Sequence, residues 1–238
     1  MMVTEEVVYS ESNTSFRGYL AYDDEVKGLK PCVMIAHDWS GRREAFCEKA
    51  KQWAGMGYVG FALDLYGDAQ LGHDNEQRLA LMTPLAENRE HLAKRMLAAF
   101  RAACEHPQID EHKIVVTGYC FGGLCALDLA RTGANLRGVI SFHGLLSEPK
   151  HKTAAEIKAK VLVLHGYDDP LVLPEQVTQF AREMTLKNVD WQVHMYGLTK
   201  HSFTNPDAHD EQLGLYYNQT ADKRSWTSSV AFLSEVFA

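Results

Sequence analysis

Long apolar runs are missing from this chain of 238 residues, and so is any excess of positive charge. No apolar segment approaches the roughly 20 residues that a membrane-spanning helix needs, which argues against an integral membrane protein. The first ten residues lack the basic and apolar segments of a signal peptide, so we expect a cytoplasmic protein. The formal net charge of −7 and the absence of a basic stripe argue against nucleic acid as a partner.

Cysteine is scarce and irregularly spaced. The five cysteines, an odd number, fit free thiols in a reducing compartment and no disulfide framework. The chain has neither the HExxH pattern nor the paired CxxC spacing of metal sites, and no Walker loop or Gly-x-Gly-x-x-Gly fingerprint of a nucleotide site. We therefore expect neither a metal nor a cofactor.

Apolar runs of strand length alternate with segments of helical spacing along the whole chain. This alternation predicts a single α/β domain over residues 1–238, with one doubly wound, mostly parallel sheet and helices on both faces. We expect residues 65–83 to cross the carboxyl edge of the sheet, and a helix to open at Pro84. Strands are expected over 7–10, 17–22, 32–36, 58–63, 114–116, 139–142, 161–164 and 191–196, and helices over 44–56, 85–104, 175–186 and 222–237, with a further helix after Cys120.

The most informative segment is residues 113–123, KIVVTGYCFGG. A β-branched run breaks into Gly-x-Cys-x-Gly-Gly and continues with helical spacing, which predicts a strand, a sharp turn and a helix with Cys120 at the tip. Gly118 and Gly122 allow close backbone approach at such a turn, and a nucleophile there projects above the sheet. The N-terminus of a helix also favours the reactive thiolate. Cys125, one turn later, is expected to be a core residue.

A nucleophile of this kind needs a histidine base and a carboxylate that orients it, and both follow in the chain. The expected strand 161–164 leads to HGYDDP, where either Asp168 or Asp169 could be the acid. The expected strand 191–196 leads to a loop that carries His201. Because the carboxyl ends of parallel strands meet at one edge, we expect these groups to converge there.

An oxyanion hole needs two backbone N–H donors. We expect one from Phe121, directly after the nucleophile, and one from Trp39 in the loop HDWSG. Five further side chains lie at strand ends or on crossing segments and are candidates for the substrate pocket: Asp38, Tyr66, Arg78, Arg89 and His143.

These motifs, in this order and spacing, resemble the dienelactone hydrolase family of α/β-hydrolases. The similarity runs from about residue 33 to 203 and rests on GYCFGG, HDWSG, DLYG, HGYDDP and KHSF. The resemblance implies the α/β-hydrolase fold and a triad of Cys120, Asp169 and His201. It also implies that Trp39 and Phe121 donate to the oxyanion.

Two positions depart from the family pattern. Asp38 stands where glutamate is common, and Asn205 replaces an arginine that binds the substrate carboxylate. Loss of this bidentate partner weakens the case for dienelactone itself, and a related ester, lactone or thioester is an equally good candidate substrate.

The resulting hypothesis is an ester or lactone hydrolase that acts through a thioester on Cys120. A small molecule is then the expected partner, and the protein is expected to be a monomer or a small homo-oligomer. Two alternatives stay open. One is a thioesterase or acyltransferase that uses the same triad, and the other is a non-catalytic binding or redox-sensing protein on the same fold.

Overall fold

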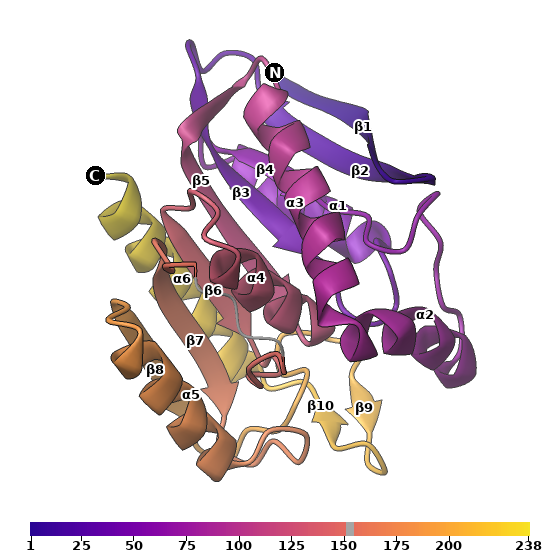
Figure 1. Cartoon of the computed structure of the whole chain (residues 1–238), viewed down its shortest axis with the longest axis vertical. Coiled ribbons are helices and arrows are strands. Elements are labelled where there is room, and N and C mark those ends of the chain that lie inside the picture. Colours follow the sequence, from indigo (N-terminus) through magenta and orange to yellow (C-terminus); the bar gives the residue numbers. More distant parts are fainter. Residues whose placement is uncertain (151–154) are drawn as a thin grey trace.

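The computed structural model describes residues 1–150 and 155–238, and its centre is an eight-stranded sheet (Figure 1). The strands lie in the order β1-β2-β4-β3-β5-β6-β7-β8. Their bounds are β1 Met2–Glu11, β2 Thr14–Asp23, β3 Lys30–Ala36, β4 Val59–Ala62, β5 Ile109–Tyr119, β6 Gly138–Phe142, β7 Lys160–Gly166 and β8 Trp191–Tyr196.

The sheet is parallel from β4 to β8 and antiparallel where β1 and β2 join it. The central strands are buried along nearly their whole length, as expected for parallel strands covered on both faces. All eight strands predicted from the sequence are confirmed, and so is the mostly parallel sheet. The carboxyl ends of the parallel strands therefore form one edge, where the candidate catalytic residues follow.

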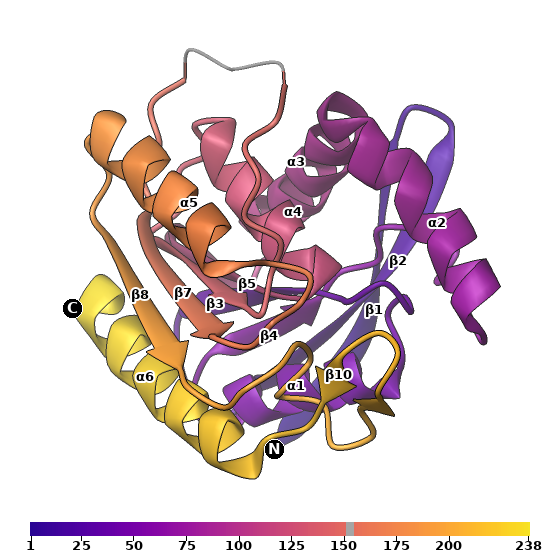
Figure 2. The ribbon, with the colours of Figure 1, turned by 90° about the horizontal axis from the view of Figure 1, so that it is seen from below.

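Helices cover both faces of the sheet (Figure 2). One face packs against α1, Glu44–Ala54, and α6, Gln219–Phe237. The other packs against α3, Arg89–Glu105, α4, Phe121–Arg131, and α5, Pro174–Leu186. Two apolar cores result, one on each side of the sheet, as predicted for a doubly wound arrangement. None of the helices in the described residues is both long and apolar enough to cross a membrane.

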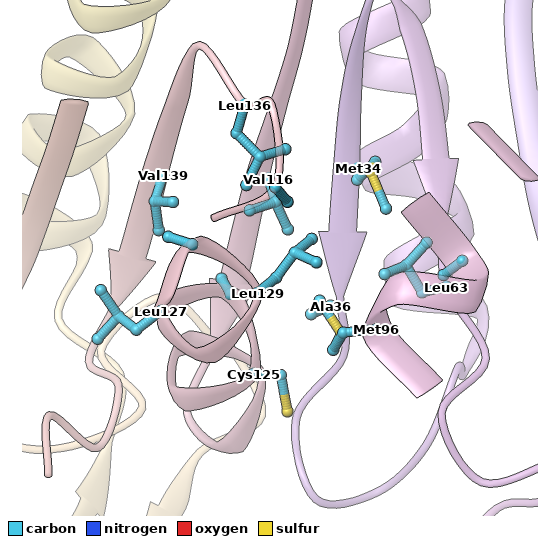
Figure 3. Packing of buried hydrophobic residues seen from close by; sticks show 14 of the residues in the cluster. Met34, Ala36, Leu63, Met96, Val116, Cys125, Leu127, Leu129, Leu136 and Val139 are labelled. Carbon is cyan, nitrogen blue, oxygen red and sulfur yellow. The ribbon is translucent and has the colours of Figure 1, made fainter. Parts of the chain in front are cut away.

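The helix α4 lies at the middle of the larger core and carries the segment that follows Cys120. All of its side chains are buried, and Figure 3 shows Cys125 and Leu129 in the same apolar cluster as Met34 and Ala36 of β3 and Met96 of α3. Cys125 is thus a core residue, as predicted. The burial of a whole helix fixes its position relative to the sheet, which in turn fixes the turn at its N-terminus.

The prediction for residues 65–104 is wrong in one respect. Pro84 does not open a helix, because it lies inside α2, Asn75–Glu87, and a second helix begins at Arg89. Two side chains set these boundaries as N-caps: Asp74 accepts a hydrogen bond from the Gln77 N–H, and Asn88 accepts one from the His91 N–H. The apolar spacing of residues 85–104 continues across the break and so conceals it.

The close contact of α4 with β3 is a testable constraint. A Cβ at Gly122 would collide with the backbone carbonyls of Ala36 and His37, so we expect Gly122→Ala to lower the free energy of unfolding by about 1–3 kcal/mol. The matched control is Gly197→Ala, where a Cβ meets no atom within 4 Å. Chemical denaturation measures both, and equal stability of the two variants would contradict the packing argument.

Candidate active site

Cys120 occupies a strained turn between β5 and α4. Its backbone has φ 54° and ψ −117°, a conformation that costs a non-glycine residue about 1–3 kcal/mol. The surrounding structure holds it there: the Cys120 N–H donates to the Phe142 carbonyl at 3.0 Å, and the backbones of Gly118 and Gly122 approach too closely for a side chain on either. The thiol stays partly exposed at the edge of the sheet. This is the geometry of a nucleophile elbow.

His201 and Asp169 form a buried pair beside the elbow. The His201 Nδ1 lies 2.7 Å from the Asp169 Oδ2, and both side chains are fully buried. The second oxygen, Oδ1, accepts a hydrogen bond from the Leu171 N–H at 2.8 Å, which fixes the carboxylate. Asp168 is exposed, and its backbone N–H bonds to Thr199. Of the two aspartates left open by the sequence, it is Asp169 that contacts the histidine.

The charge state of His201 is coupled to Cys120. Burial lowers the pKa of His201, whereas the electrostatic interaction with Cys120 and the hydrogen bond to Asp169 raise it, with a net result of about 10. The other ring nitrogen, Nε2, is buried and makes no hydrogen bond within the described residues. Because folding raises this pKa above 6.5, the protonated ring stabilises the fold fully below about pH 6.5, and the contribution is lost as the pH rises through about 10.

A short two-stranded sheet that the sequence did not predict supports the His201 loop. It pairs β9, His209–Asp210, with β10, Leu215–Tyr216. The Tyr216 N–H donates to the His201 carbonyl at 2.9 Å, and the Asn218 N–H donates to the Phe203 carbonyl at 3.1 Å. Two-residue strands leave almost no periodic signal in a sequence, so only the fold reveals this support.

The two predicted oxyanion donors are brought together by one tyrosine. The Tyr66 hydroxyl donates to the Trp39 carbonyl at 2.9 Å, and its ring stacks on Phe121 with centroids 6.4 Å apart. Phe121 begins α4, so its N–H has no acceptor within that helix. The Trp39 N–H donates to no described residue. Tyr66 itself is buried, and its hydroxyl contacts the backbone of Trp39.

Two of the candidate pocket residues, Asp38 and His143, line one cavity of about 1060 Å³ between α1, α6 and the His201 loop. Asp38 Oδ1 accepts hydrogen bonds from the N–H and hydroxyl of Ser40. Asn205 also lines this cavity, and Lys49 reaches it from α1. The lining of this cavity includes none of Cys120, Asp169 and His201, and the connection to the candidate triad is through His143, whose ring centroid lies 5.1 Å from that of His201.

The two candidate arginines have different positions. Arg78 lies over the Trp39 ring, 5.6 Å from its centroid, and so stands at the rim of the site. Arg89 does not reach the site, which corrects that expectation. It forms a bidentate ion pair with Asp128 and lines a separate cavity whose lining includes none of the other candidate residues. The buried Asp128 carboxylate on α4 binds the Arg89 guanidinium, and no sequence pattern predicts this ion pair.

No group of three histidine, cysteine or acidic side chains within residues 1–150 and 155–238 is arranged to hold a metal ion.

Several known proteins are similar to this chain over most of its length. The model of the dienelactone hydrolase family matches residues 16–237. The dienelactone hydrolase-like promiscuous phosphotriesterase P91, from metagenomic libraries, is 35% identical with a TM-score of 0.94, covering 99% of this chain and 98% of its own. The structure of m3DLH is 36% identical with a TM-score of 0.95, covering 100% and 99%.

Curated sequences agree with these structures. An uncharacterized protein of Caenorhabditis elegans is 38% identical over 62% of this chain and 95% of its own length. A protein of Aquifex aeolicus named "Putative carboxymethylenebutenolidase" is 25% identical over 95% and 96%. The sheet and the structural similarity define an α/β-hydrolase. Within that class, the chain belongs to the dienelactone hydrolase family and is a carboxylic ester hydrolase.

The coupling between Cys120 and His201 can be measured without a substrate. Cys120→Ala removes the electrostatic interaction between the sulfur and the ring, so we expect the pKa of His201 to fall below about 10. An NMR titration of the imidazole reports this value. The control is Cys104→Ala, a half-buried thiol on α3. An unchanged value near 10 in Cys120→Ala would show that the sulfur and the ring do not interact.

Proposed function

We propose that this protein hydrolyses a small ester or lactone through Cys120, with His201 as general base and Asp169 as the group that orients it. One observation carries the proposal: a partly exposed thiol on a strained elbow is electrostatically coupled to a buried histidine that an aspartate holds at 2.7 Å. A nucleophile, a base and an orienting acid in this relation are the requirements of covalent acyl transfer.

The first half of the reaction transfers the acyl group to sulfur. The Cys120 proton resides on the His201 ring, and the thiolate attacks the substrate carbonyl carbon, so that a C–S bond forms and the carbonyl oxygen becomes an oxyanion. The N–H groups of Trp39 and Phe121 donate to this oxyanion. When the C–O bond to the leaving group breaks, the imidazolium gives its proton to the departing alkoxide. The product is a thioester on Cys120.

The second half releases the acid. The neutral His201 ring takes a proton from a water molecule, whose oxygen attacks the thioester carbonyl, and the same N–H groups stabilise the second oxyanion. The C–S bond then breaks. The thiolate leaves, and the imidazolium and thiolate are restored as a pair. The Asp169 carboxylate accepts the hydrogen bond of the Nδ1–H and so orients and stabilises the imidazolium.

The residues around the site favour an ester without an acidic group. Asn205, which lines the cavity beside the triad, offers an amide in place of a cation. Asp38 lines the same cavity and adds negative charge, although Arg43 lies 3.6 Å from its carboxylate. A carboxylate on the substrate would meet this charge without a bidentate partner at Asn205. We therefore expect neutral esters and lactones to be better substrates than dienelactone.

Hydrolysis of p-nitrophenyl acetate and of a dienelactone tests the proposal. We expect Cys120→Ala and His201→Ala to lower kcat by about 1000-fold or more, because members of a triad act as one unit. Asp169→Asn should also lose most activity, since the histidine loses its orienting acid. The matched control is Asp168→Asn, which changes the adjacent, exposed carboxylate and should leave kcat unchanged.

Each outcome separates the proposal from its alternatives. If folded Cys120→Ala hydrolyses the ester as fast as the wild type, the cysteine mechanism is refuted. Modification of Cys120 by peroxide without turnover of any ester would favour a redox sensor. Transfer of the acyl group to added alcohols or thiols in place of water would favour an acyltransferase. Circular dichroism of every variant confirms that lost activity is not lost structure.

A second activity is supported by the similarity to the promiscuous phosphotriesterase P91. The same thiolate could attack the phosphorus of an aryl dialkyl phosphate, forming a P–S bond and expelling the aryloxide, and water would then hydrolyse the phosphorylated cysteine. We expect slow release of p-nitrophenolate from such a triester by the wild type and none by Cys120→Ala. If the wild type releases none, with intact ester hydrolysis, the activity is confined to carboxylic esters.

A further inference from the structure

His143 lies directly under the candidate triad, at the end of β6. Its backbone has φ 39°, which is uncommon for a non-glycine residue, and its N–H donates to the Leu164 carbonyl at 2.8 Å. Only 3% of the residue is exposed. The sequence predicted only that His143 is a candidate for the substrate pocket. That prediction does not explain why a buried histidine with a strained backbone lies beside the His201 loop.

The ring of His143 contacts three residues of the loop that carries His201. Its Nε2 is hydrogen-bonded to the Thr204 Oγ1 at 2.8 Å. Its ring meets the His201 ring edge to face, with centroids 5.1 Å apart and an interplanar angle of 65°. It meets the Phe203 ring at the same distance and an angle of 80°. These contacts join the end of β6 to His201 itself and to the two residues, Phe203 and Thr204, that follow it closely in the loop.

His143 is uncharged in this position. Burial lowers the pKa of His143 well below its usual value, and the neighbouring charges of His201 and Lys49, with a smaller effect of His165, lower it further. A protonated ring at this place would repel the imidazolium of His201. The neutral ring instead packs against the imidazolium without that penalty.

We propose that His143 is the positioning residue of His201, holding the ring and its loop in the orientation in which Nε2 can exchange a proton with Cys120. This inference rests on the proposed function, because it takes His201 as the base. The hydrogen bond to Asp169 restrains one nitrogen of the His201 ring but leaves rotation about that bond. The His143 ring blocks the rotation, and its bond to Thr204 fixes the chain three residues further on.

Misplacement of a catalytic group by about 1 Å is enough to cost about 100-fold in rate. The restraint therefore acts on kcat, because His143 is buried beneath the base and does not need to touch the substrate. His143 and Thr204 also line the cavity of about 1060 Å³, so a direct contact with the substrate would appear as a change in KM, whereas loss of the restraint alone lowers kcat and leaves KM nearly unchanged. A merely structural residue would alter stability and leave the titration of His201 as it is.

Two substitutions remove the two parts of the restraint. Thr204→Val deletes the hydroxyl with nearly unchanged shape, and His143→Asn deletes the ring with a residue that tolerates φ above zero. Thr204→Ser keeps the hydroxyl and serves as the conservative variant. The matched control is Thr178→Val on α5, whose hydroxyl donates only to the Pro174 carbonyl.

For hydrolysis of p-nitrophenyl acetate we expect Thr204→Val and His143→Asn to lower kcat about 10- to 100-fold, with KM within about twofold of the wild type. The pKa of His201, followed by NMR, should fall below about 10, because the ring no longer keeps its place beside Cys120 and Asp169. Thr204→Ser and Thr178→Val should match the wild type in both measurements.

Wild-type kcat and an unchanged His201 titration in folded Thr204→Val and His143→Asn would overturn the inference. If His143→Asn does not fold, Thr204→Val decides alone. Failure of the proposed function is distinguishable, because wild type without any ester turnover would refute that function while the NMR titration of His201 still reports whether Thr204 and His143 hold the ring.

Discussion

The close contact between α4 and the ends of β3 and β5 is the constraint on which the site depends. Gly118 and Gly122 meet backbone to backbone, and no side chain fits between them. Because α4 is buried all round, it cannot move away to relieve the strain at Cys120. The unfavourable φ of Cys120 is thus maintained by core packing, at a cost that the apolar burial of the helix offsets.

His201, the candidate base, is positioned by contacts within a loop and not by core packing of a helix. His201 lies in a loop that no helix or long strand includes, and it is held by polar contacts from several directions: Asp169 at Nδ1, the short β9–β10 pair at the backbone, and His143 with Thr204 beneath the ring. Each contact restrains a different degree of freedom. A loop held in this way can present a catalytic group with the precision of a rigid element.

Electrostatic interactions connect Cys120 with the His201 loop. Burial alone would keep His201 neutral, yet the adjacent sulfur and carboxylate raise its pKa to about 10. His143 is kept neutral by the same burial, with no carboxylate to offset it. Two histidines with ring centroids 5.1 Å apart therefore differ in charge, and their acidic neighbours explain why. In the proposed function, this difference in charge suits His201 to proton transfer and His143 to packing against it.

The sequence determined the eight main strands, the α/β class and the order of Cys120, Asp169 and His201, because apolar periodicity and glycine spacing are local properties. It did not determine the break between α2 and α3, which two capping side chains set within a continuous apolar pattern. From the residues alone it could not decide between the adjacent Asp168 and Asp169, because only the fold buries one of them against His201 and exposes the other. Arg89 was placed wrongly because its partner Asp128 is 39 residues away in the chain. The contacts of His143 with the His201 loop, and the β9–β10 pair, were likewise decided only by the tertiary structure, since they join segments whose proximity depends on how the whole sheet is assembled.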